Sequence, residues 1–276
     1  MRRVPLFSLL SLTLTVAACG PEPLPETRAR EVPVAWGKLD PAHPEVGDLG
    51  GCSSTLIGRR TVLTAAHCVK SPGRIYTFKT LGSTYKSTSH IVHPDYDGDI
   101  SNDADLAVVH LATNVLGVKP ARLVPDTLKA GEKIVLVGFG LTDTDQNNGG
   151  VKYVGENIID KLSSMTFTIL NEKGAGSCPG DSGGPSFVFR DGEERQAGIH
   201  SRGTFPPCGS LFGSAIDVRV DAFRPWIEQQ AGADLYKGAA IDTESPKVTI
   251  LSPVDGANVH RNLTVKATAT DNVGVI

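Results

Sequence analysis

A series of short apolar, β-branched runs begins at about Val34, and this pattern most constrains the fold. The runs are STLIG, TVLTA, LAVVHL, KIVLVGFG, MTFTIL, PSFVF and SAIDVRV. Glycine, asparagine, aspartate or proline separates them, which is typical of antiparallel strands joined by turns. The pattern predicts an all-β barrel or sandwich. Pro120 and the segment LVPDTLKAG divide the region into two β-rich halves.

One helix is predicted near the end of this region, in DAFRPWIEQQAG. Asp221 is positioned to cap its N-terminus, and Gly232 follows its last turn. The residues that share one face are Phe223, Trp226, Ile227 and Gln230. We expect this face to pack on the core.

The N-terminus has the pattern of an export signal. Two arginines precede an apolar stretch too short for a membrane span, and small residues then lead to Cys19. The Val-Ala-Ala-Cys sequence ending there resembles the bacterial lipobox, in which the cysteine is acylated with a diacylglyceryl group. The same small residues suit ordinary signal cleavage, so a lipoprotein at the cell envelope and a secreted protein both stay open, the lipoprotein being favoured. Residues 1–18 are predicted to be a signal peptide, and the Pro-rich residues 19–33 a tether or propeptide.

The charge balance gives no sign of a polyanionic partner. The chain has 27 basic and 30 acidic residues, a formal net charge of -3, and no long run of either sign. Nucleic-acid binding is therefore not expected.

Four cysteines besides Cys19 are available for two disulfides in an exported chain. They are Cys52, Cys68, Cys178 and Cys208. Spacing alone leaves all three pairings open. No Cys-x-x-Cys or His-x-x-x-His pair indicates a metal site.

The stretch AGSCPGDSGGP surrounds Ser182 with four glycines, which suggests backbone amides positioned for a function. A serine nucleophile needs a histidine base, and that base works best beside an orienting carboxylate. His67 ends an apolar run in TVLTAAHCV. Asp105 opens another in NDADLAVVHL, with Asp103 as its local competitor.

Three motifs in this order resemble those of the trypsin-like, or chymotrypsin-fold, serine peptidases. They are LTAAHC at the histidine, DLAVVHL at the aspartate and GDSGGP at the nucleophile, and the resemblance extends from about Val34 to Gln230. HPDY, VGFG and the WI of the last helix also fall where the family has equivalents, and the middle motif selects Asp105 over Asp103. The resemblance implies a serine endopeptidase of two antiparallel six-stranded β-barrels, with the active site between them and a C-terminal helix.

The resemblance also implies residue roles. His67, Asp105 and Ser182 would form the catalytic triad, and the amides of Gly180 and Ser182 the oxyanion hole. The implied disulfides are Cys52–Cys68 and Cys178–Cys208. The implied partners are protein or peptide substrates. No cofactor or metal is implied, and the catalytic domain is expected to be a monomer.

The expected specificity pocket differs from that of trypsin. Trypsin has an aspartate six residues before its serine, where this chain has Gly176. A buried carboxylate would be needed to pair a substrate Arg or Lys, so we expect a small or medium apolar P1 residue instead. The pocket residues implied by the resemblance are Gly176, Ser177, Ser201, Arg202 and Gly203, with Arg202 replacing a common tryptophan.

The expected activation also differs from the family pattern. In the family, the aspartate equivalent to Asp181 pairs with a newly cut N-terminal ammonium, but the usual Arg-Ile-Val-Gly-Gly start is absent and VAWGK is the nearest counterpart. Val34 as the new N-terminus requires cleavage after Pro33, whereas cleavage after Arg28 or Arg30 leaves extra residues. Another protease, trimming and an uncut active form all stay open.

The predicted domain boundaries follow from these motifs. Residues 34–232 form the peptidase domain and residues 233–246 a linker. Residues 247–276 resemble the opening strands of bacterial immunoglobulin-like modules in TILSPVDGANV and VKATATDNVGV. A complete sandwich needs about 100 residues, so the module is expected to be incomplete.

Several other features are expected to have no role. The remaining histidines, expected to be surface or locally bonded, are His43, His90, His93, His110, His200 and His260. DYDGDISNDAD has a misplaced glycine for an EF-hand calcium loop. Asn262 matches the glycosylation pattern, but a bacterial-looking lipobox argues against its use. The alternative function is a catalytically silent binding or adhesion protein of the same fold, against which the intact triad argues.

Overall fold

The computed structural model describes residues 37–141, 149–204, 208, 210–238, 247–258 and 264–270. The predicted signal peptide, Cys19 and Val34 lie outside these residues, as do His260 and Asn262. Within the described part of the chain, every helix is too short or too polar to cross a membrane.

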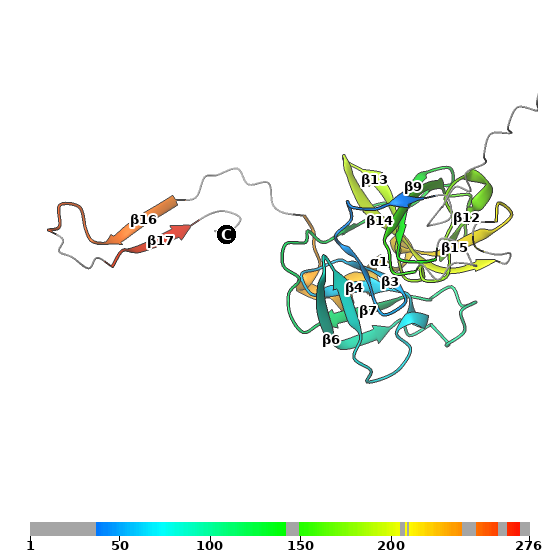
Figure 1. The fold of residues 1–276 in the computed structure, drawn as a ribbon, viewed down its shortest axis with the longest axis horizontal. Helices are drawn as coiled ribbons and strands as arrows, with labels where there is room; N and C mark the ends of the chain where they lie inside the picture. The colour runs from blue at the N-terminus through cyan, green and yellow to red at the C-terminus, as the bar shows by residue number, and fades with distance from the viewer. Residues whose placement is uncertain are drawn as a thin grey trace, which may run out of the picture. The chain divides into compact units, whose positions relative to one another are not determined.

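Six antiparallel strands close the first barrel, in the order β2-β3-β4-β7-β6-β5 (Figure 1). They are β2 (Val46–Asp48), β3 (Ser53–Leu56), β4 (Thr61–Thr64), β5 (Thr77–Thr80), β6 (Ser83–Val92) and β7 (Ala107–Leu111). Three predicted runs, STLIG, TVLTA and LAVVHL, form β3, β4 and β7. Their apolar side chains, among them Leu56, Val62 and Val109, are fully buried around Phe78. A closed barrel leaves no unpaired sheet edge.

The second β unit is a nine-stranded sheet, in the order β1-β10-β9-β13-β14-β15-β12-β11, with β8 parallel to β14. Its strands are β1 (Lys38–Leu39), β8 (Arg122–Leu123), β9 (Lys133–Gly138), β10 (Tyr153–Ile158), β11 (Lys161–Leu162), β12 (Thr166–Leu170), β13 (Pro185–Arg190), β14 (Glu193–Thr204) and β15 (Ser214–Arg219).

The prediction of two closed barrels is correct for the first unit and differs from the structure in the second. No ladder among the described residues closes the nine-stranded sheet, since β11 is two residues long and pairs with β12 alone. A side chain bridges part of the gap: Asn157 Nδ2 on β10 donates to the carbonyls of Leu170 (3.0 Å) and Ala175 (2.7 Å).

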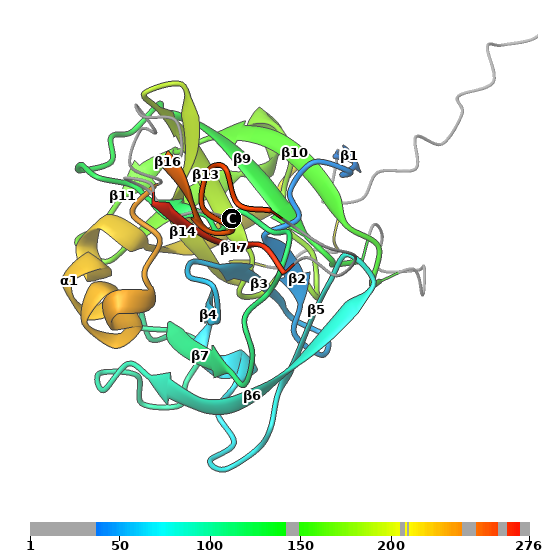
Figure 2. The ribbon, with the colours of Figure 1, turned by 90° about the vertical axis from the view of Figure 1, so that its left-hand side faces the viewer.

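Helix α1 (Val220–Ala231) contacts β7, β8 and β14, so it touches strands of both β units (Figure 2). It buries Phe223 and Ile227, as predicted from its apolar face, and Gly232 ends it at φ 57°. The predicted cap is wrong. Arg219 occupies the N-cap position, and Asp221 instead accepts a hydrogen bond from the amide of Leu128 (3.1 Å) and pairs with Arg219. Three short 3-10 turns complete the unit: Ala66–Cys68, Asn171–Lys173 and Gly232–Asp234.

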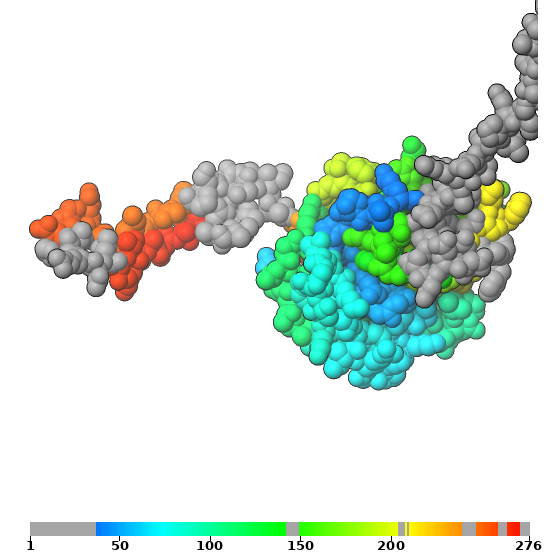
Figure 3. Space-filling view, in the orientation of Figure 1, coloured from blue at the N-terminus to red at the C-terminus, as the bar shows by residue number. Residues whose placement is uncertain are grey.

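The two β units share one apolar interface. Leu63 and Val108 of the first barrel belong to the same buried cluster as Phe167, Ile199 and Ile227 of the second unit and the helix. The blue-to-cyan first barrel lies directly against the green-to-yellow second unit (Figure 3). Loops that meet at this junction therefore have fixed relative positions.

Two further strands, β16 (Lys247–Ser252) and β17 (Lys266–Thr270), pair antiparallel in the C-terminal segment. They agree with the strand-like runs predicted there.

Candidate active site

His67 and Asp105 lie beside each other, one just after the end of strand β4 and one just before the start of its antiparallel neighbour β7. His67 lies in the 3-10 turn after β4, and Asp105 lies just before β7, which pairs with β4. The imidazole Nδ1 donates to Asp105 Oδ2 at 2.7 Å, and the His67 amide donates to Oδ1 at 2.9 Å. The carboxylate is completely buried, whereas 16% of the histidine side chain is exposed. The buried carboxylate therefore fixes the orientation of the imidazole through Nδ1, and the opposite side of the ring is partly exposed.

A hydroxyl group is the third hydrogen-bond donor to the carboxylate of Asp105. Ser201 Oγ on β14 donates to Asp105 Oδ2 at 2.7 Å. The sequence also predicts Ser201 in the wall of the substrate pocket, and that prediction stays open. The contact of its hydroxyl with Asp105 spans 96 residues of sequence, and no motif indicates it.

Asp103, the competing acid, has a different partner. Its carboxylate accepts a hydrogen bond from Arg202 Nη2 at 2.6 Å, and Arg202 Nη1 donates to the carbonyl of Ile100 at 3.2 Å. Arg202 therefore holds the acidic loop before β7. The choice of Asp105 over Asp103 as the partner of His67 agrees with this geometry.

Ser182 lies in the loop before β13, and Ser53 of β3 fixes that loop across the junction. The Ser53 amide donates to the carbonyl of Ser182 at 2.8 Å, and its hydroxyl donates to the carbonyl of Gly180 at 2.9 Å. Ser53 Oγ also accepts the amide of Phe139 at 2.8 Å. Ser53 is fully buried, and these three hydrogen bonds hold the loop of Ser182 against β3. No sequence motif indicates this role. Within the described residues, the Ser182 hydroxyl and His67 are not hydrogen-bonded; such contacts are often long in enzymes without substrate.

Two amides of the nucleophile loop have no acceptor among the described residues. These are the N–H groups of Gly180 and Ser182, whereas the amides of Asp181, Gly183 and Gly184 all donate to carbonyls. Gly180 has φ +101°, a conformation that favours glycine. The loop therefore offers two unsatisfied donors beside the serine, the arrangement that stabilises an oxyanion.

Asp181 is turned away from the two free amides and into the protein. Its carboxylate accepts the amides of Gly140 and Cys178, each at 2.8 Å. A Cβ at Gly138 would lie 2.1 Å from Asp181 Oδ1, which explains the glycines of the VGFG sequence. Burial raises the pKa of Asp181 to about 6, although the two amides oppose the shift. A cation at this site would reverse that effect.

The expected specificity pocket has a neutral base. Gly176 leaves room for Asn171, whose amide atoms would lie 2.3 to 2.8 Å from a Cβ at this position. Asn171 Nδ2 donates to the carbonyl of Ser210 at 2.9 Å, while its buried Oδ1 has no partner within the described part of the chain. Ser177 is half-buried beside Gly176, and Gly203 pairs with Ala215 across the β14–β15 ladder.

The open side of His67 borders a cavity with Lys70, Tyr96, Asp97 and Asp99 on its walls. Burial raises the pKa of Tyr96 to about 12, and the nearby negative charge of Asp105 adds to the shift. Positively and negatively charged residues therefore line this cavity beside the imidazole.

Both disulfides implied by the resemblance are present, Cys52–Cys68 and Cys178–Cys208. The first lies beside His67 and the second closes the nucleophile loop. Cys52, His67 and Cys68 are close enough to share an ion, but disulfide sulfurs are not the thiolate ligands that a zinc site needs.

Other proteins are similar to this chain in sequence. A family model described as Trypsin matches residues 44–227, and one described as Bacterial Ig domain matches residues 246–276. Kallikrein-8 of Mus musculus is 28% identical over 205 residues, which cover 64% of this chain and 76% of that protein. Chymotrypsin-2 of Vespa crabro is 28% identical over 205 residues, which cover 63% of this chain and 86% of that protein.

A solved structure has the same fold. It is that of neuropsin, a serine protease expressed in the limbic system of mouse brain, with a TM-score of 0.62 and 24% identity. The match covers 71% of this chain and 99% of that one. Since the family match spans more than half of the sequence, the chain belongs to the trypsin family of serine proteases and carries a C-terminal segment of the bacterial Ig type.

Proposed function

We propose that this protein is an active serine endopeptidase that uses His67, Asp105 and Ser182. The observation that carries the proposal is the pair His67 Nδ1 and Asp105 Oδ2, 2.7 Å apart, at the junction where Ser53 holds the loop of Ser182. The free amides of Gly180 and Ser182 add the donors that acyl transfer requires.

In the first half of the reaction, Ser182 Oγ attacks the peptide carbonyl carbon while His67 Nε2 takes its proton. The buried Asp105 carboxylate accepts Nδ1–H, which fixes the tautomer and stabilises the imidazolium. The carbonyl oxygen becomes an oxyanion and accepts the amides of Gly180 and Ser182. The C–N bond then breaks, and His67 gives its proton to the leaving amine.

In the second half, water attacks the acyl-enzyme ester while His67 again acts as base. The ester C–O bond breaks, Ser182 Oγ recovers a proton from His67, and the carboxylic acid product leaves. Ser201 takes no proton in this scheme. Its hydroxyl holds Asp105 in place.

Labelling with a fluorophosphonate tests the proposal. Correctly processed wild type should be labelled at Ser182, Ser182→Ala should not be labelled, and Ser186→Ala should be labelled like wild type because Ser186 is buried and bonds to Asp217. Failure to label processed wild type would favour the alternative, a silent binding or adhesion protein. Equal labelling of Ser182→Ala would also contradict the proposal.

For specificity, we propose a small or medium apolar P1 residue rather than Arg or Lys. The support is that Gly176 places no carboxylate at the expected pocket base, where Asn171 is neutral. The buried acids on neighbouring elements, Asp181 and Asp217, already have hydrogen-bond donors. A peptide library should therefore show little cleavage after Arg or Lys, and predominant cleavage there would overturn the pocket assignment.

For maturation, we propose export, acylation at Cys19 and a zymogen step that frees the amine of Val34. The support is the sequence pattern at the N-terminus together with the buried carboxylate of Asp181, which accepts two backbone amides and whose pKa is raised by burial. N-terminal sequencing and the intact mass of the exported protein test both steps. A mature protein without lipid, or an active one that begins elsewhere, would contradict them separately.

A further inference from the structure

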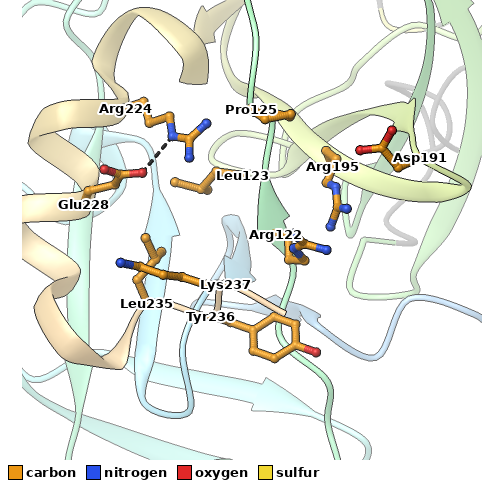
Figure 4. Close-up of a pocket in the computed structure, with 10 residues that line it drawn as sticks. All are labelled: Arg122, Leu123, Pro125, Asp191, Arg195, Arg224, Glu228, Leu235, Tyr236 and Lys237. Carbon is orange, nitrogen blue, oxygen red and sulfur yellow. Dashed lines mark hydrogen bonds and ion pairs between the residues drawn. The ribbon is translucent and has the colours of Figure 1, made fainter. Parts of the chain in front are cut away.

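A basic cavity lies away from the catalytic residues, between α1, β8 and the β13–β14 hairpin (Figure 4). Its volume is about 250 Å³. None of the residues that line it is His67, Asp105 or Ser182. The charged residues on its walls are Arg122, Asp191, Arg195, Arg224, Glu228 and Lys237. We call it the Arg195 pocket.

Arg195 is the central charge of this pocket. Only 4% of its side chain is exposed, yet its single side-chain hydrogen bond among the described residues is from Nη1 to Glu193 Oε2, at 2.9 Å. A guanidinium has five N–H donors. The remaining nitrogens of Arg195 are absent from the buried atoms that lack a partner, so they are accessible to solvent on the wall of the cavity, where an anion can accept their hydrogen bonds.

The acid that Arg195 uses is shared with two other cations. Lys119 Nζ lies 3.2 Å from Glu193 Oε1, and Arg122 Nη1 lies 3.4 Å from the same Oε2 that Arg195 contacts. These cations, Lys119 first, hold the pKa of Glu193 below its ordinary value. One carboxylate thus faces three positive charges.

The opposite wall does not compensate for this excess. Arg224 Nε pairs with Glu228 at 2.7 Å and Nη1 donates to the carbonyl of Val124, which leaves Nη2 without a partner among the described residues. Figure 4 shows this pair on α1, facing the wall that carries Arg122 and Arg195. Lys237 adds a further cation, and Asp191 the one remaining acid.

We propose that the Arg195 pocket binds a phosphate or sulfate group. Guanidinium groups recognise such oxyanions through paired hydrogen bonds, and the walls of this one cavity carry such groups on α1, β8 and β14. The cavity is smaller than the roughly 300 to 1,000 Å³ of sites for drug-sized ligands, so the group recognised is a small anion or the esterified end of a larger molecule.

Titration of the full chain with inorganic phosphate at constant ionic strength, followed by calorimetry and thermal unfolding, tests this inference. We expect saturable binding and a rise in Tm that follows the phosphate concentration. Arg122→Gln with Arg224→Gln, both partly exposed, should weaken binding by about tenfold or more. The matched control, Lys86→Gln with Lys161→Gln, removes the same charge from exposed strand positions and should bind as wild type does.

Further ligands distinguish the source of the anion. A sugar sulfate that binds more tightly than inorganic sulfate would indicate an ester on a polysaccharide, whereas equal affinities would indicate a free anion. Either result supports the site. Absence of saturable binding in the millimolar range, equal weakening in the control variant, or acetate binding as tightly as phosphate would overturn the inference. None of these outcomes depends on the peptidase activity, since the readout is binding.

Discussion

Strand β14 contributes adjacent residues to two hydrogen-bonded networks of the same composition. Ser201 donates to Asp105, which also holds His67; its neighbour His200 donates through Nδ1 to Asp217 at 3.0 Å, and Asp217 also accepts from Ser186. The β14–β15 ladder shifts register between His200 and Arg202, so Ser201 is the extra residue of a bulge, and residues 200 and 201 serve different networks. Each network thus has a buried aspartate between a histidine and a serine.

The two networks differ in what lies beyond the imidazole. His67 is 16% exposed, borders a cavity and lies at the junction with the loop of Ser182. His200 is 8% exposed, and its ring makes no hydrogen bond other than the one to Asp217 among the described residues. Asp217 and Ser186 are completely buried. Under the proposed mechanism, exposure of the histidine and a nearby separate serine distinguish the first network, whereas the buried second network is suited to stabilising the fold.

The largest expected difference between the networks is in how far kcat falls when the aspartate of each is replaced by asparagine. Asp105→Asn should lower kcat by about 10⁴-fold, because the amide favours the wrong tautomer of His67. Asp217→Asn should lower kcat of the folded protein by less than about a hundredfold, the cost of a small displacement away from the chemistry. Steady-state kinetics on a peptide substrate, corrected for the folded fraction, measures both. Comparable losses in the two variants would mean that the second network takes part in catalysis.

The next difference is in stability. His200→Ala leaves the buried carboxylate of Asp217 with Ser186 alone, so the free energy of unfolding should fall by about 3 kcal/mol. In His67→Ala, Asp105 keeps the hydroxyl of Ser201 and the backbone amide of residue 67, so the loss should stay near 1 kcal/mol. Urea unfolding of both variants gives the values. A larger loss for His67→Ala would reverse the assignment of structural and catalytic roles.

The first network could be predicted from sequence because its members lie in motifs. LTAAHC, DLAVVHL and GDSGGP each combine a reactive residue with a recognisable strand or turn, and the structure brings His67 and Asp105 together as expected. The apolar runs likewise predicted β3, β4, β7, β9, β12, β13 and β15, because short runs of apolar and β-branched residues are typical of buried strands.

The second network could not be predicted because polar residues form part of the core. Asp217 interrupts the apolar run SAIDVRV, and β14 reads EERQAGIHSRGT, whose buried members include Arg195, Gln196 and His200. Such a strand has no apolar periodicity, and its polar pairing depends on partners distant in sequence. His200 was accordingly expected to have no role. At the open edge of the second sheet, the side chain of Asn157 likewise bonds to residues distant in sequence, beside the backbone hydrogen bond from Ala175 to Glu156.

A third expected effect is confined to a range of pH and concerns Asp181, which lies next to Ser182 and is influenced by the second network. Beyond burial, the charge of His200 lowers the pKa of this carboxyl and that of Asp217 raises it, with a result of about 6. Because this is above the ordinary 3.8, the folded protein holds the proton more tightly than the unfolded chain does. The contribution of Asp181 to stability is therefore greatest below about pH 4 and declines as the pH rises through about 6.

Asp181→Asn should remove this decline, which amounts to about 2 to 3 kcal/mol in the unprocessed chain. Urea unfolding of wild type and variant from acid to neutral pH measures the difference, and subtraction of the two curves cancels groups that titrate in both. In a chain cleaved before Val34, the new ammonium should lower the pKa of Asp181 and abolish the decline. Identical pH profiles for wild type and Asp181→Asn in the unprocessed chain would mean that Asp181 already has a cationic partner, so that the nucleophile loop needs no new N-terminus.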